Sequence, residues 1–148
     1  MPTQGHLGRK LENSVKTWLG RNDIHGISLA GLAIRLFDED DDTVLPRIVI
    51  KAEVEKEELP GGGIYAVKLE VSLFIDKDST TAQVANENYW SAIRDIMDYD
   101  ILAKKLSEGT DFHCYGITSR DGTTESIQDR TSVKTIRMTL ACMAQDNS

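Results

Sequence analysis

Hydrophobic and polar residues alternate most regularly over residues 64–75 of this sequence. From Tyr65 onward every second residue is apolar, and Lys68, Glu70 and Ser72 occupy positions between the apolar ones. Successive side chains of a β-strand point to opposite faces, so this spacing predicts a strand with one buried and one solvated face. We expect the rest of the chain to be organised around this long strand.

A second alternating run covers residues 47–55 and is followed by a glycine-rich segment at residues 56–63. The apolar positions of this run share one face of the predicted strand, namely Ile48, Ile50, Ala52 and Val54. Pro60 and three consecutive glycines then favour a flexible loop over a strand. The two runs are therefore expected to form a long antiparallel hairpin. Its acidic, glycine-rich tip supplies candidate contact residues, namely Glu57, Glu58, Gly61, Gly62 and Gly63.

Helical spacing occurs in two other regions of the chain. An apolar stripe formed by Leu11, Val15, Trp18 and Leu19 predicts a helix that begins at Arg9. Residues 82–97 carry a second stripe, which a capping box at Thr80 and Gln83 introduces, and residues 101–107 favour a short further helix. Residues 1–8 and 144–148 are polar or glycine-containing, so we expect both ends of the chain to be flexible.

Shorter alternating segments predict further strands at residues 31–37, 111–117 and 133–143. Asp121-Gly122 is a strong turn signal, so residues 123–129 are expected to pair back across a turn there. The order of elements indicates one α+β domain spanning residues 1–148. We predict a mostly antiparallel twisted sheet that contains a long hairpin and is packed by helices on one face.

Charge and composition narrow the classes of function. The chain has 148 residues and a formal net charge of −7. Wrapping of nucleic acid is therefore not expected, because phosphate binding needs a basic surface. No apolar run reaches the roughly 18 residues of a membrane span, and the N-terminus lacks the basic and apolar pattern of a secretion signal. Neither a membrane partner nor secretion is predicted.

The two cysteines, Cys114 and Cys142, each lie within a predicted strand and form no Cys-x-x-Cys motif. This placement favours two reduced thiols in the core. A disulfide between them would require neighbouring strands and an oxidising compartment. The cysteines are thus expected to be structural.

No catalytic, cofactor-binding or metal-binding residue is predicted. The three histidines lack metal-ligand spacing, and neither a nucleophile elbow nor a phosphate-binding loop is present. A run of five consecutive acids is expected to form a solvated loop, although its oxygens could also bind a hard cation. These acidic residues are Asp38, Glu39, Asp40, Asp41 and Asp42.

The order of elements resembles that of the tail-terminator, or tail-completion, proteins of long-tailed bacteriophages. The resemblance covers residues 9–143: a helix, the strand at Pro46–Ile50, the loop at Gly61–Gly63, the strand at Tyr65–Ile75, an aromatic-rich helix and a closing strand. It implies a virion protein without enzymatic activity or cofactor, assembled in the host cytoplasm as a hexameric ring. The ring would cap the tail tube and join it to the head connector, so its partners would be the tail tube protein and the head–tail connector protein.

On this interpretation, DNA passes through the lumen of the ring, and an acidic lumen would let it slide. Residues 38–42 are the candidate lumen segment, although they would serve equally as a loop on the outer surface. Two other functions stay open. One is a different neck or tail component, such as a connector or tube subunit, and the other is a small ligand-binding domain.

Overall fold

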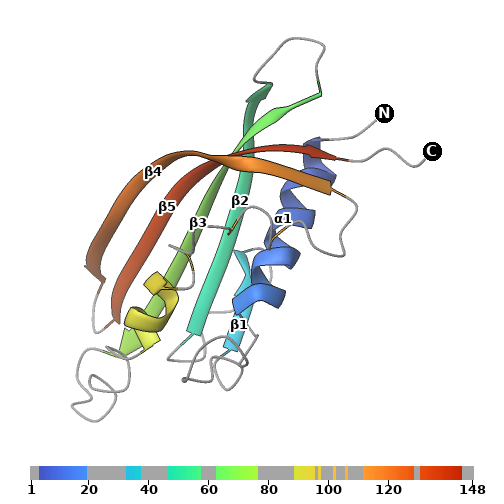
Figure 1. Ribbon diagram of the computed structural model, residues 1–148. Coiled ribbons are helices and arrows are strands. Elements are labelled where there is room, and N and C mark those ends of the chain that lie inside the picture. Colours follow the sequence, from blue (N-terminus) through green and yellow to red (C-terminus); the bar gives the residue numbers. More distant parts are fainter. Residues whose placement is uncertain are drawn as a thin grey trace.

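The computed structural model describes most of the chain in six elements (Figure 1). They are α1 (Gln4–Leu19), β1 (Ala33–Leu36), β2 (Arg47–Glu57), β3 (Tyr65–Asp76), β4 (Phe112–Gln128) and β5 (Thr131–Ala144). The described residues are 4–19, 33–37, 47–57, 63–76, 89–95, 97, 102, 106, 112–128 and 131–144. The predicted α+β class is confirmed.

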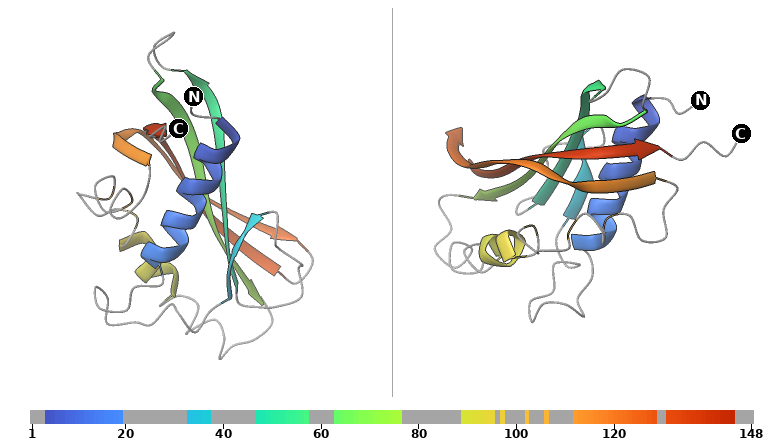
Figure 2. Two further views of the ribbon diagram at one scale, coloured as in Figure 1. Left: turned by 90° about the vertical axis from the view of Figure 1, so that its right-hand side faces the viewer. Right: turned by 45° about the horizontal axis from the view of Figure 1, so that its top comes forward.

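The strands form one five-stranded sheet in the order β1-β2-β3-β5-β4. β1 runs parallel to β2, and the other neighbouring strands are antiparallel. β2 and β3 pair from Arg47 opposite Phe74 to Glu57 opposite Tyr65. The strands turn progressively across the sheet (Figure 2). The alternating patterns at residues 64–75 and 47–55 therefore identified the central strand of the sheet, β3, and its neighbour β2.

The hydrophobic core lies on the face of the sheet that α1 covers. Leu69 and Leu73 of β3 are fully buried, as are Leu7 and Leu11 of α1. Each such side chain contributes about 1.5–3 kcal/mol by leaving water. Residues 89–95 are helical and lie on the same side of the sheet as α1 (Figure 2). The side chain of Ile93 belongs to the same core cluster. The capping box predicted at residues 80–83 lies outside the described residues.

The flexible arm predicted for residues 1–8 is wrong from Gln4 onward, because α1 begins there. Leu7 is fully buried and extends the stripe of Leu11 by one helical turn. The glycines near it suggested a loop, but Gly8 has a packing role instead. A Cβ at Gly8 would lie 3.0 Å from the carbonyl oxygen of Ala52, so its absence lets α1 approach β2 closely.

The turn predicted at Asp121-Gly122 is also wrong, because β4 continues through it as a strand of 17 residues. The pairing of β4 with β5 shifts register between Arg120 and Gly122, and Gly122 has a φ of 88°. A glycine with positive φ thus forms a β-bulge here, where the sequence suggested a hairpin turn. The strand goes on to pair Gln128 with Thr131.

Candidate interaction surfaces

Most of the residues predicted to contact partners lie outside the residues that the structure describes. The acidic run at residues 38–42 lies outside the described residues, as do Glu58, Gly61 and Gly62. Glu57 is the last residue of β2. Gly63 precedes β3 with a φ of 75°, a backbone conformation that favours glycine. The structure therefore places the two ends of the predicted hairpin tip and leaves its contact role a prediction.

Each of the two edges of the sheet carries an exposed aromatic side chain. Phe37 directly follows β1 and is 55% exposed, and Tyr115 of β4 is 52% exposed. The Lys51 ammonium lies 4.6 Å from the centre of the Phe37 ring. The ring of Tyr115 packs edge-on against that of His113, with 4.6 Å between the centroids. Among the described residues these are the exposed large hydrophobic side chains, and they lie on opposite edges.

The face of the sheet opposite the core carries a network of polar contacts. The Nε of Arg137 on β5 donates to Glu70 on β3 at 3.2 Å, and its Nη1 donates to the Thr124 hydroxyl on β4 at 2.7 Å. The hydroxyls of Ser72 and Thr135 are 2.9 Å apart. These contacts link β3, β5 and β4 side by side. Such cross-strand pairs each contribute roughly 0.2–1 kcal/mol and fix the register of the sheet.

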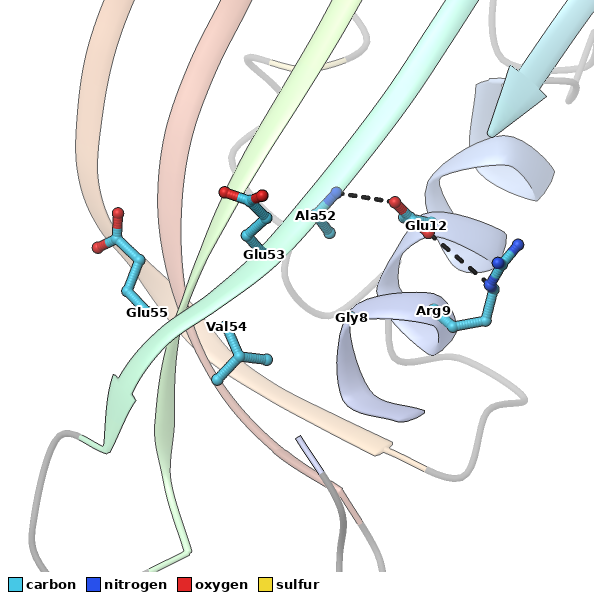
Figure 3. A pocket seen from close by; sticks show the side chains of 7 residues that line it. All are labelled: Gly8, Arg9, Glu12, Ala52, Glu53, Val54 and Glu55. Atoms are coloured by element: carbon cyan, nitrogen blue, oxygen red, sulfur yellow. Dashed lines mark hydrogen bonds and ion pairs between the residues drawn. The ribbon is translucent and has the colours of Figure 1, made fainter. Parts of the chain in front are cut away.

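A groove of about 730 Å³ lies between α1 and the second half of β2 (Figure 3). Its lining residues are Gly8, Arg9 and Glu12 from α1, and Ala52, Glu53, Val54 and Glu55 from β2. The backbone N–H of Ala52 donates to Oε2 of Glu12 at 3.0 Å, and the Nε of Arg9 lies 4.0 Å from Oε1 of the same carboxylate. A glutamate of the helix thus stands where a neighbouring strand would place its carbonyl oxygen.

The sequence did not reveal this groove. Residues 1–8, which include Gly8, are predicted to be flexible, and the spacing of the apolar stripe predicts no role for Glu12. One signal was available: Gly8 and Glu12 lie four residues apart and directly follow Leu7 and Leu11 along the buried stripe. This spacing places a small and a polar residue together at the border of the buried face.

The two cysteines face each other in neighbouring strands. Cys114 of β4 is registered opposite Cys142 of β5, both side chains are buried, and their sulfurs are 3.0 Å apart. The hydrogen bond with Cys114 raises the pKa of the Cys142 thiol well above its ordinary value of 9.0, and burial raises this pKa further. No disulfide joins these two cysteines, and the thiol of Cys142 is uncharged at neutral pH.

Within the described ranges no group of three or more His, Cys, Asp or Glu side chains is arranged to hold a metal ion. In the same part of the chain, no helix has the length and apolar character needed to cross a membrane. Neither a protein-family model nor a curated protein matches this chain. The sheet edges and the groove are therefore the candidate interaction surfaces of this chain.

Proposed function

We propose that this protein is a structural subunit that assembles into a closed ring, as the resembling tail-terminator proteins do. The ring would cap a phage tail tube, end its polymerisation and present a surface to the head connector. One observation carries the proposal: the sheet has two unlike edges, each with an exposed aromatic side chain.

Unlike edges favour a ring because of the symmetry of the contact. An edge that pairs with its own copy gives a two-fold dimer, whereas a contact between two different patches repeats around an axis and forms a ring when the rotation closes. Tyr115 on the β4 edge and Phe37 at the β1 edge supply the two patches. Exposed aromatics of this kind are frequent anchors of protein interfaces.

The lengths of the edge strands fit this role. β4 spans 17 residues, whereas β1 spans four. A long strand edge offers backbone groups to a neighbouring subunit, while the bulges along β4 limit indiscriminate pairing. The polar network around Arg137 stiffens the sheet next to this edge. The net charge of −7 would let DNA pass through a lumen without binding.

Two single variants test the contact. Phe37→Ala removes one patch and Tyr115→Ala removes the other, so each variant alone is expected to be monomeric at concentrations where the wild type forms rings. In a mixture, the intact Tyr115 patch of the Phe37→Ala variant can contact the intact Phe37 patch of the Tyr115→Ala variant. The mixture should therefore form heterodimers that do not grow further, because the other patch of each subunit is lost. Thr123→Ala, at an exposed position of β4, is the matched control and should assemble normally.

Native mass spectrometry separates the outcomes of this experiment. Rings in the wild type and heterodimers in the mixture would support the proposal. A wild-type monomer at all concentrations would contradict it. Open filaments would instead favour a tube subunit, whose contacts repeat without closing.

A further inference from the structure

The second half of β2 presents a backbone edge to the groove beside α1. β1 pairs with β2 only from Arg47 to Ile50, and among the described residues no strand continues along this edge beyond that point. The N–H of Ala52 points toward α1, where Glu12 accepts it. Alternate residues of a strand direct their backbone groups to the same edge, so the N–H and C=O of Val54 face the groove as well.

The side chains around this edge differ on its two sides. Figure 3 shows Glu53 and Glu55 projecting to one side of β2, whereas Val54 projects to the other. The side chain of Glu53 is 63% exposed and lies 3.4 Å from Lys51, and Glu55 is exposed. The groove thus combines a strand edge, an acidic side and a small apolar side.

We propose that this groove binds an extended segment of a partner protein, which adds to β2 as a further strand. The segment carries Lys or Arg at alternate positions, which lie beside Glu53 and Glu55, with a small apolar residue between them beside Val54. Because Glu12 already accepts the Ala52 N–H, backbone hydrogen bonds to the N–H and C=O of Val54 hold the segment, and the alternating side chains select it. Three residues suffice to follow Glu53–Glu55, because a strand advances roughly 3.3 Å per residue.

A different protein is the occupant, because the long edge strand of this chain, β4, does not match the groove. Along the exposed positions described for β4 there is one arginine, Arg120, and its Nη1 donates to the Met97 carbonyl at 3.1 Å. The groove binds its partner whether or not the ring of the proposed function forms.

Fluorescence anisotropy with labelled heptapeptides tests this proposal on the full chain. The probe alternates lysine with valine, and a second peptide has glutamate in place of lysine. Two further probes carry N-methyl groups on alternate amides. In one probe these groups lie along one edge of the extended peptide, and in the other probe they lie along the opposite edge. Both keep the charge of the parent peptide, but only one blocks the edge that would pair with β2. We expect the parent peptide to bind, the glutamate peptide not to bind, and one N-methylated peptide to lose binding while the other keeps it.

Protein variants locate the site. Glu55→Gln should weaken binding about threefold, and Glu53→Gln combined with Glu55→Gln about tenfold, as expected for cross-strand charge pairs. Glu125→Gln, an exposed glutamate on β4, makes the same charge change at the opposite edge and should leave the affinity unchanged. The proposal would be overturned if the parent peptide did not bind, or if both N-methylated peptides bound equally well. It would also be overturned if Glu125→Gln weakened binding as much as Glu55→Gln does.

Discussion

Oxidation of the facing cysteines should link β4 covalently to β5. Cys114 and Cys142 are opposite one another in an antiparallel pair, where the Cα separation of about 4.5–5.5 Å suits a disulfide. Glutathione disulfide is the oxidant: the two thiols lose two protons and two electrons, and the reagent is reduced to two glutathione thiols. The reaction should be slow in the native state, because both sulfurs are buried and the pKa of Cys142 is raised.

The expected gain in stability follows from the length of the loop that the bond closes. The two cysteines are 28 residues apart in sequence. In the chain-entropy model, closing a loop of this length raises the free energy of unfolding by about 3.6 kcal/mol at 25 °C. The free energy of unfolding falls by about 1–3 kcal/mol for each molar increase in urea, so the urea concentration at the unfolding midpoint should rise by roughly 1–4 M.

Urea unfolding of the oxidised and the reduced protein measures this shift directly. Thiol titration in denaturant should count two thiols before oxidation and none after it, and adding a reductant should return the midpoint to its original value. Cys142→Ala is the control, since its unfolding midpoint should not respond to the oxidant. The reasoning is refuted if complete exposure to the oxidant leaves both thiols titratable, or if the oxidised protein unfolds at a lower urea concentration than the reduced one.

Three further predictions concern stability. Leu11→Ala should lower the free energy of unfolding by about 2–5 kcal/mol, because the side chain is fully buried between α1 and the sheet, whereas exposed Lys16→Ala should change it by less than about 0.5 kcal/mol. Glu12→Ala should cost about 1–3 kcal/mol by removing the acceptor of the Ala52 N–H, and Glu12→Gln should recover part of this loss. Above pH 9.0 the unfolded Cys142 thiol ionises while the folded one stays protonated, so the free energy of unfolding should fall by up to about 1.4 kcal/mol per pH unit, a component that Cys142→Ala lacks.

Chemical denaturation at fixed temperature checks all three. A Leu11→Ala protein as stable as the Lys16→Ala protein would contradict the packing described for α1. No difference between Glu12→Ala and the wild type would show that the contact with β2 contributes nothing. The same alkaline slope in Cys142→Ala and the wild type would assign that slope to other groups.

The parts of the fold that could be predicted from the sequence are those in which apolar and polar residues alternate without interruption. The alternation at residues 64–75 predicted β3 (Tyr65–Asp76) almost to its ends, because each inward position meets the same core. β4 was predicted in two pieces because its bulges interrupt the period of two. The start of α1 was missed because Gly5 and Gly8 weaken a helical signal that Leu7 restores only through its burial in the tertiary structure.

The candidate interaction surfaces were less predictable, and for a physical reason. The groove exists because α1 crosses β2 where β1 ends, and this crossing depends on contacts between residues some forty positions apart, such as Glu12 and Ala52. Local spacing does not encode such a contact. The facing cysteines show the same limit: their strands were predicted, but the register that pairs them comes from three shifts along β4.

The mass of the purified particle tests the central claim most directly. If unlike edges of the sheet join copies of this chain, native mass spectrometry of the wild type should show one closed assembly, expected at six times the 16.5 kDa chain mass, whose size does not grow with concentration. A particle that stays at the mass of a single chain throughout the same concentration range would contradict the account.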